Sequence, residues 1–307
     1  MLAVLTDERF SDPAWIFERK LDGMRCLAFR QGSEVRLRSR TRHALNATFP
    51  ELVEALLAQA PEQFVLDGEI VAFEGNQTSF ARLQRRLGIQ DPDRARRTGV
   101  AVFYYLFDVL HLEGHDVSGL PLRERKAILR EVFCFEDPLR FTPHRDAEGE
   151  SFYAEACRDG WEGLIAKRAD APYRHKRSRD WLKFKCVAGQ EFVVGGYTDP
   201  GGRRIGFGSL LVGYYDGRGR LRYAGKVGTG YTDAVLRDLG ARLARLEQEE
   251  SPFAGDELPT KAHWVAPELV AQVGYTELTR DLRLRHPRFL GLRDDKRPRE
   301  VVLERPR

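Results

Sequence analysis

Near the start of the chain, a lysine follows a buried-strand pattern and precedes a turn. Residues 15–19 begin with an apolar run, and Asp22-Gly23 supplies the turn, so Lys20 lies where a strand leaves the core. Partial desolvation and the nearby cations Arg19 and Arg25 both penalise a protonated amine, so we expect Lys20 to lose affinity for its proton. Its free amine could then act as a nucleophile. The alternative is an ordinary solvated surface lysine.

The composition indicates a folded protein with a mild excess of positive charge. The chain has 307 residues, of which 42% are hydrophobic, which is enough for one large domain or two. Lysines and arginines number 50 against 46 acidic residues, and the formal net charge of +4 permits an anionic partner without requiring one.

The cysteine spacing and the N-terminal residues indicate the cellular compartment in which the protein is expected. Cys26, Cys134, Cys157 and Cys186 form no Cys-x-x-Cys pair, which argues against a zinc site or a disulfide framework and favours a reducing compartment. The acidic N-terminal residues are unlike a signal peptide, and no run of about 18 apolar residues occurs. We therefore expect a soluble cytoplasmic protein without membrane association.

The first half of the chain alternates apolar strands with short helices. The patterns predict strands at 15–19, 26–30, 34–39, 64–73, 100–110 and 161–168, and helices at 50–57, 79–87, 122–133 and 151–158. Asp67-Gly68-Glu69 interrupts the apolar strand 64–73, and burying two carboxylates there is costly unless a cation, a metal or a hydrogen-bond donor meets them. The alternative is a surface turn that joins two short strands.

A basic segment, 173–185, ends this half. Lys183 and Lys185 alternate with apolar residues, so on a strand both side chains share one face. A row of cations that faces a pocket suits phosphate, whereas the alternative is a solvated strand face.

From Glu191 onward, short strands are separated by glycine turns. Residues 216–219 are a hairpin signal, Thr232 caps a helix predicted over 231–249, and further strands are expected near 261–265 and 269–278. About five strands with one helix suit a small Greek-key barrel of the oligonucleotide-binding kind. We predict one domain over residues 1–187 and the barrel over residues 188–307.

These features occur in the order seen in the covalent nucleotidyltransferases. The chain resembles ATP-dependent DNA ligases over essentially its whole length, and especially compact bacterial ligases, either stand-alone or the ligase module of end-joining enzymes. The resemblance is carried by ERKLDGMR, SR followed by FPEL, LDGEIVAF, LFDVL, EGLIAKR, WLKFK and LRHPRFLGLRDDK. It implies an α+β fold class, in which an adenylation domain of mixed, largely antiparallel sheets with helices precedes an all-β OB-fold domain.

The resemblance also implies a nucleotide site. Lys20 takes AMP as a lysyl phosphoramidate, Glu18 lies near the adenine amino group, and Phe107 stacks on the adenine ring. Arg25 and Glu69 address the ribose. ATP is accordingly the expected cofactor.

The resemblance further implies which residues bind the α-phosphate and which bind a metal ion. Lys183 and Lys185 match the pair that holds the α-phosphate, and Glu162, together with Glu69, matches the metal-site acids. The metal is expected to be Mg²⁺, for which Mn²⁺ could substitute.

The barrel domain contributes the last motif. Arg285, Arg293, Asp295 and Lys296 match the residues that orient pyrophosphate during the first step. Because this motif lies more than a hundred residues from the others, we expect the barrel to swing in for adenylation of Lys20 and out to admit DNA.

Nicked double-stranded DNA is the implied substrate. Arg40 matches the residue that reaches the 5′-phosphate of the nick, and the basic loop with Arg174, Lys176 and Arg177 could grip phosphates, although ordinary solvated charge is the alternative. We expect a monomer that acts at the nucleoid, with an end-binding or clamp protein as a candidate partner.

Two other functions compete with DNA ligation. Lys-x-Asp-Gly is shared with RNA ligases and capping enzymes, whereas Ser39-Arg40 and the last motif favour DNA ligases. A non-catalytic nucleic-acid-binding protein would use only the barrel and the basic surface. An NAD-dependent ligase is disfavoured because only nineteen residues precede Lys20 and the usual zinc cysteines are missing.

Overall fold

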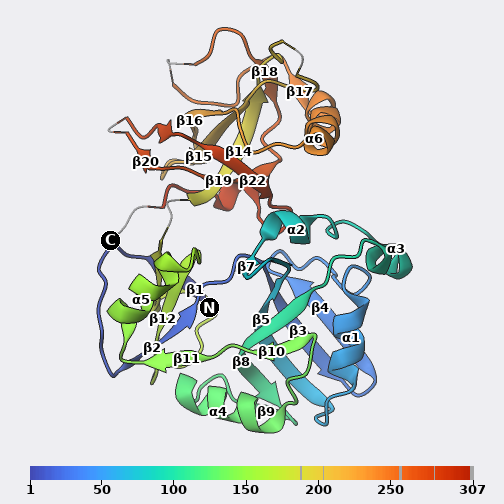
Figure 1. Cartoon of the computed structure of the whole chain (residues 1–307), viewed down its shortest axis with the longest axis vertical. Coiled ribbons are helices and arrows are strands. Elements are labelled where there is room, and N and C mark those ends of the chain that lie inside the picture. The colour runs from blue at the N-terminus through green and yellow to red at the C-terminus, as the bar shows by residue number, and fades with distance from the viewer. Residues whose placement is uncertain (187–188, 203, 256–257, 280, 305–307) are drawn as a thin grey trace. The chain divides into compact units, whose positions relative to one another are not determined.

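The computed structural model describes residues 1–186, 189–202, 204–255, 258–279 and 281–304 (Figure 1). The chain forms two compact units, the first ending at Cys186 and the second at Glu304. The boundary predicted between residues 187 and 188 lies outside the described residues. The first unit combines helices with two large sheets and the second is mostly β-structure, which confirms the predicted α+β class.

A five-stranded sheet carries the segment with Lys20. Its strand order is β1-β13-β12-β2-β11. The strands are β1 (Leu2–Leu5), β2 (Trp15–Arg19), β11 (His144–Asp146), β12 (Gly163–Arg168) and β13 (Arg177–Lys185). Helix α5 (Gly149–Arg158) covers one face, because its Phe152 packs in one apolar cluster with Phe17 and Phe184. The opposite face is therefore left for other contacts.

A second sheet of the same unit has the order β10-β8-β5-β3-β4, with β9 beside β8. Its strands are β3 (Met24–Gln31), β4 (Glu34–Ser39), β5 (Gln63–Val71), β8 (Phe103–Leu112), β9 (His115–Asp116) and β10 (Leu139–Phe141). One face packs on α1 (Pro50–Leu57) and α4 (Leu122–Val132) through an apolar cluster that includes Leu52, Leu66 and Leu129.

The Asp-Gly-Glu segment lies inside β5, so the alternative of a surface turn is wrong. Asp67 is fully buried there. Gly68 is needed for close packing, because a Cβ at this position would lie 2.5 Å from the carbonyl oxygen of Tyr105 on the neighbouring strand. The residues between the two carboxylates therefore continue the sheet and fix both acids on it.

Short elements account for most differences from the prediction. The helix expected at 79–87 is confirmed at its start, where Ser79 caps α2 (Phe80–Gln84), but it ends early. The pattern missed α3 (Pro92–Arg97), the hairpin of β6 (Phe73–Glu74) and β7 (Gln77–Thr78), and the strands β10 and β11. Elements of two to six residues are too short to display a period in the sequence.

The second unit is built around antiparallel strands. Along the path β16-β15-β14-β19-β22, the strands are β14 (Gly189–Tyr197), β15 (Leu210–Tyr215), β16 (Leu221–Val227), β19 (Val270–Gly274) and β22 (Arg288–Leu292). A bridge between Thr229, just after β16, and Arg288 brings the two ends of this path together. The predicted barrel organisation is thereby confirmed.

The remaining elements of this unit surround the barrel strands. They are α6 (Asp233–Arg245), β17 (Glu247–Gln248), β18 (His263–Val265), β20 (Glu277–Leu278), β21 (Leu284–Arg285) and the 3₁₀ helix Pro298–Glu300. Thr232 caps α6 as predicted, and Asp216 closes the predicted β15–β16 hairpin by accepting hydrogen bonds from the backbone of Arg218 and Arg220. Among the described residues, no helix combines the length and apolar character needed to cross a membrane.

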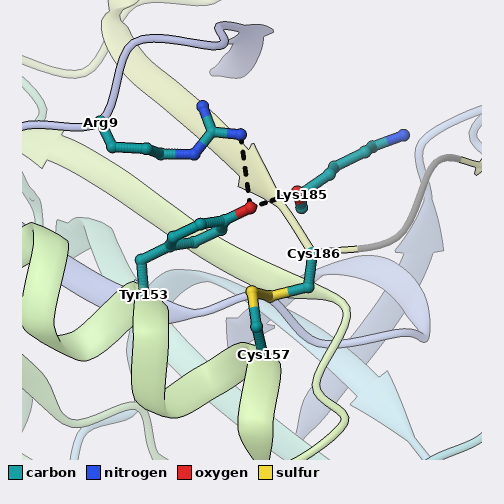
Figure 2. The surroundings of a disulfide bond; sticks show 5 residues. All are labelled: Arg9, Tyr153, Cys157, Lys185 and Cys186. Atoms are coloured by element: carbon teal, nitrogen blue, oxygen red, sulfur yellow. Dashed lines mark hydrogen bonds between the residues drawn. A yellow bond between two sulfur atoms is a disulfide. The ribbon is translucent and has the colours of Figure 1, made fainter.

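A disulfide joins Cys157 of α5 to Cys186, directly after β13, so the expectation that the cysteines form no disulfides is wrong for this pair (Figure 2). Their sequence separation is 29, and only the packing of α5 on the sheet brings them together. The Tyr153 hydroxyl donates to the carbonyl of Lys185 at 2.8 Å beside the disulfide. Cys26 and Cys134 are free thiols.

Reduction of this disulfide is expected to lower the free energy of unfolding by about 2–4 kcal/mol, because the cross-link restricts the unfolded chain. The measurement is urea-induced unfolding with and without dithiothreitol. A Cys157→Ser variant should show the same loss and no further response to the reductant. Cys134→Ser is the matched control, since an exposed free thiol should matter by less than about 0.5 kcal/mol. Identical unfolding curves for oxidised and reduced protein would contradict this prediction.

Candidate active site

The face of the five-stranded sheet opposite α5 brings three of the sequence motifs together. Ile165 in β12 pairs with Glu18 on one side and with Lys183 on the other. Two residues earlier in β12, Gly163 pairs with Lys185 of β13. The Gly163 carbonyl accepts a hydrogen bond of 2.9 Å from the backbone nitrogen of Lys20. Motifs separated by more than 140 residues are therefore adjacent because β2, β12 and β13 are neighbours in the sheet.

Lys20 forms an ion pair with Glu162, and the two side chains are 19% and 24% exposed. The arginines expected to crowd Lys20 have other partners. The guanidinium of Arg19 lies 4.4 Å over the Trp161 ring, and that of Arg25 bonds Asp67. The predicted nucleophile and the predicted metal-site acid are thus direct neighbours.

Arg25 forms a two-pronged ion pair with Asp67. Its Nε and Nη2 donate to the two carboxylate oxygens at 2.9 and 2.6 Å, and the Tyr173 hydroxyl donates to Oδ2 at 2.7 Å. Burial alone would raise the pKa of Asp67, but Arg25 holds that pKa below its ordinary value. Glu69, the partner predicted to address the ribose with Arg25, pairs with it across the β3–β5 ladder. Sequence reasoning singled out Asp67 as a costly burial but gave it no role in the site.

Glu18 is held between two buried lysines. Lys126 of α4 contacts one carboxylate oxygen at 2.6 Å, and Lys167 of β12 contacts the other at 2.5 Å. Burial acts to raise the pKa of Glu18, but the two ammonium groups keep it below its ordinary value. Neither lysine was predicted as a site residue. Lys167 is the penultimate residue of the EGLIAKR segment, whereas Lys126 lies in an ordinary helical pattern that gives no signal.

Phe107, predicted to stack on adenine, is 9% exposed and belongs to a small cluster with Trp181 and Tyr173. Two cations flank it, with the ammonium of Lys167 at 4.1 Å and the guanidinium of Arg25 at 5.3 Å from the ring centre. These contacts connect the two sheets, because Lys167 belongs to one and Phe107 to the other. Its role in stacking stays a prediction.

The buried Lys167 should make stability depend on pH. Burial lowers the pKa of its ammonium to about 8, against an ordinary value of 10.5 in the unfolded chain. Between these values the unfolded state binds a proton that the folded state has lost, so stability should rise with pH by up to about 1.4 kcal/mol per unit. Urea unfolding at pH 7.5 to 9.5 should show this rise in the wild-type protein and a flatter dependence in Lys167→Met. Parallel curves for the two proteins would contradict it.

Glu162 has the chemistry of a magnesium ligand. Its Oε2 atom is buried and makes no hydrogen bond to the described residues, while Oε1 faces Lys20. Among the described residues no three His, Cys, Asp or Glu side chains gather to hold a metal. Because Mg²⁺ commonly uses one or two carboxylates together with waters and substrate phosphates, the Glu162 carboxylate fits that kind of site, and the role of Glu69 as a second acid stays a prediction.

The predicted DNA-binding residues lie at the ends of strands. Arg40 follows β4 and is half-buried, and Lys176 is exposed. Arg174 pairs with Asp180 at 2.8 Å, and Arg177 donates to the carbonyl of Ala3 at 2.6 Å. Both arginines thus combine a structural contact with substantial exposure.

The predicted pyrophosphate residues of the second unit are ion-paired with acids of the same unit. Arg293 pairs with Asp295 through bonds of 2.8 and 2.9 Å. Lys296 lies 2.9 Å from Glu191, and Arg285 lies 2.6 Å from Glu277. Asp295 is buried, so it orients Arg293 rather than facing a ligand by itself.

Comparison with known families covers most of the chain. Residues 1–185 match the family described as the ATP dependent DNA ligase domain, and residues 203–296 match the ATP dependent DNA ligase C terminal region. The two matches correspond to the two compact units.

Curated relatives are similar over nearly the whole chain. The chain is 39% identical over 302 residues to the multifunctional non-homologous end joining protein LigD of Pseudomonas aeruginosa, covering 95% of this chain and 35% of that protein. It is 38% identical over 299 residues to a LigD protein of Mycobacterium tuberculosis, covering 94% of this chain and 37% of that one. The chain thus spans about a third of the length of these relatives.

Solved structures are similar over almost their entire length. A structure described as mycobacterial DNA ligase D complexed with ATP and MES matches with a TM-score of 0.68 and 34% identity, covering 99% of this chain and 98% of that one. The ligase domain of Mycobacterium tuberculosis LigD matches with a TM-score of 0.50, the same identity and the same coverage.

Proposed function

The chain belongs to the ATP-dependent DNA ligases, and on this premise we propose that Lys20 accepts AMP from ATP and passes it to the 5′-phosphate of nicked duplex DNA. The observation that carries the proposal is the adjacency of Lys20, Glu162, Lys183 and Lys185, which come from three separate motifs and meet on neighbouring strands. RNA ligases and capping enzymes share the Lys-x-Asp-Gly motif, so the assigned substrate has to be tested against theirs.

In the first step the Lys20 amine attacks the α-phosphorus, a P–N bond forms, and the P–O bond to pyrophosphate breaks. An ammonium has no free electron pair, so Lys20 must first lose a proton, and the carboxylate paired with it is Glu162. Lys183 and Lys185 present cations from the adjacent strand to the phosphate oxygens. Magnesium, held by Glu162 and Glu69, would supply further neutralisation of the charge that develops.

In the later steps the DNA 5′-phosphate takes AMP from Lys20, and the adjacent 3′-hydroxyl then displaces AMP to close the strand. Arg40 is proposed to contact the 5′-phosphate. Arg293 and Lys296 are proposed to leave their carboxylate partners and orient pyrophosphate in the first step. Monomeric action at the nucleoid and cooperation with an end-binding or clamp protein complete the proposal.

Incubation of the full chain with α-labelled ATP and Mg²⁺ tests this function. We expect one label per chain, which moves to a nicked duplex carrying a 5′-phosphate and leaves a sealed strand. A nick with a 5′-hydroxyl should take no label. Preferential labelling by GTP would indicate a capping-type enzyme, and sealing of RNA nicks alone would indicate an RNA ligase. Absence of label together with DNA binding would indicate a non-catalytic module.

A further inference from the structure

We propose that Lys126, which lies outside all the motifs that define the site, is a positioning residue that selects adenine over purines with a carbonyl at the 6-position. It acts through Glu18. This inference rests on the proposed function and on the expected place of Glu18 near the adenine amino group.

The contacts of Lys126 fix its ammonium in one place. It bonds Oε1 of Glu18 at 2.6 Å and the carbonyl of Thr142 at 2.9 Å, and it lies 4.6 Å from the centre of the Phe141 ring. The Lys126 and Glu18 side chains are only 2% and 3% exposed. Because α4, β2 and the segment before β11 all contribute to this group, Lys126 ties Glu18 to elements outside its own strand.

Hydrogen-bond chemistry links this arrangement to purine selection. An ionised carboxylate only accepts hydrogen bonds, so it can receive one from an amino group but repels a carbonyl oxygen. A protonated carboxyl could donate to that carbonyl, and the distinction would be lost. Lys126 donates a hydrogen bond to Oε1 and Lys167 lies 2.5 Å from Oε2 as an ion-pair partner, which leaves a further acceptor site on each oxygen. The two cations therefore favour the form of Glu18 that discriminates.

Other charged and titratable groups around Glu18 do not replace Lys126. His144 pairs with Glu18 across the β2–β11 ladder, and burial and Lys126 both lower the pKa of its imidazole, which favours the neutral form. Asp108 is engaged by Arg125. Lys167 also lies 4.1 Å from the rings of Phe107 and Trp181, so it is placed directly against the ring proposed to stack on adenine. Lys126 instead contacts Glu18, Thr142 and Phe141, away from the ring proposed to stack on adenine, so we assign it the positioning role.

The test compares labelling of Lys20 by α-labelled ATP and by α-labelled inosine triphosphate, which carries a carbonyl where ATP carries an amino group. Lys126→Met removes the charge at similar volume. We expect its KM for ATP to rise at least about tenfold and its KM for inosine triphosphate to change less than about threefold, with maximal rates largely kept. Loss of the Lys126 cation raises the pKa of Glu18, so the ATP preference of the variant should weaken at a higher pH than that of the wild-type protein, and both proteins are measured from pH 6 to 9. In the variant, the acid limb of the ATP profile should move to higher pH.

Matched variants separate this role from a general loss of structure. Lys126→Arg keeps the charge and should restore the nucleotide ratio to within about threefold of wild type, and the exposed Lys226→Met should leave it unchanged. Equal losses for both nucleotides, or a fall in maximal rate at unchanged KM, would overturn the inference. If Lys126→Met does not fold, Lys126→Gln replaces it, because glutamine is a neutral hydrogen-bond donor. An unchanged ratio of ATP to inosine triphosphate use in Lys126→Gln would also overturn the inference.

Failure of the inference can be told apart from failure of the proposed function. If the wild-type protein takes no label from ATP, the proposed function is wrong. If the wild-type protein seals nicked DNA but uses ATP and inosine triphosphate equally, the proposed function stands and the role of Lys126 is wrong.

Discussion

Replacement of Lys20 by alanine or arginine is expected to reduce covalent AMP transfer by more than about a thousandfold, the scale on which removal of an enzyme's nucleophile acts. Alanine removes the amine, and arginine keeps a positive charge but offers no nucleophilic nitrogen at the same place. The ion pair with Glu162 shows that the native amine is held at one position rather than projecting freely. The measurement is the rate of protein labelling by α-labelled ATP in a single turnover.

The expected loss should be confined to the steps that use the amine. A nicked duplex that already carries AMP on its 5′-phosphate should still be sealed by the Lys20→Ala protein, because the final attack comes from the DNA 3′-hydroxyl. The exposed Lys226→Ala is the matched control and should label normally. A Lys20→Ala protein that labels at the wild-type rate would place the nucleophile elsewhere and remove the basis of the proposed mechanism.

Local sequence patterns predicted the parts of the site that strands carry. The apolar run before Lys20 and the alternation around Lys183 and Lys185 each specify a strand and a face, and the structure has β2 and β13 at those positions. What the pattern could not give is the order of strands in the sheet. The adjacency of Lys20 to Glu162 depends on β12 lying between β2 and β13.

The residues that sequence reasoning missed are those whose role depends on distant packing. Lys126 lies on a helix and looks like any charged residue there, and only the approach of α4 to β2 gives it a buried carboxylate partner. Cys157 and Cys186 show no spacing motif for the same reason. Asp67 did carry a signal, since an acid in an apolar strand requires a partner, but the sequence did not identify Arg25 as that partner.

Buried charges are concentrated where the two sheets of the first unit face each other. Glu18 with its lysines and Asp67 with Arg25 lie on these inner faces, and each pair is costly to desolvate. Such pairs give little net stability compared with apolar residues of the same volume. Under the proposed function, these pairs would hold acceptors and donors in fixed positions around a nucleotide.

The pair of Asp108 and Arg125 provides the largest expected effect on stability. Both side chains are fully buried, and Nε and Nη2 of Arg125 donate to the two carboxylate oxygens at 2.7 and 2.9 Å. Burial raises the pKa of Asp108 even with Arg125 beside it. Replacement of Arg125 by methionine would leave a buried carboxylate without its cation, so we expect a loss of about 3–5 kcal/mol in the free energy of unfolding.

Urea unfolding followed by tryptophan fluorescence measures this loss. In a Trp264→Phe background the remaining tryptophans, Trp15, Trp161 and Trp181, all lie in the first unit, so the signal reports on that unit alone. Arg123→Met is the matched control on the same helix. Its ion pair with Asp146 is exposed, and its removal should cost less than about 1 kcal/mol.

The double variant Asp108→Leu with Arg125→Met shows whether the stability loss of Arg125→Met comes from the unpaired carboxylate or from lost packing and hydrogen bonds of the arginine. If the cost of Arg125→Met comes from the unpaired carboxylate, replacing that carboxylate as well should recover most of the stability, because two apolar side chains can fill the buried space without desolvation of charge. A double variant less stable than Arg125→Met would instead assign the cost to the contact that Arg125 makes with the carbonyl of Ala171 at 3.2 Å and to packing around it. A single-variant loss below about 1 kcal/mol would contradict both explanations, since neither a buried unpaired charge nor a lost buried donor is tolerated so easily.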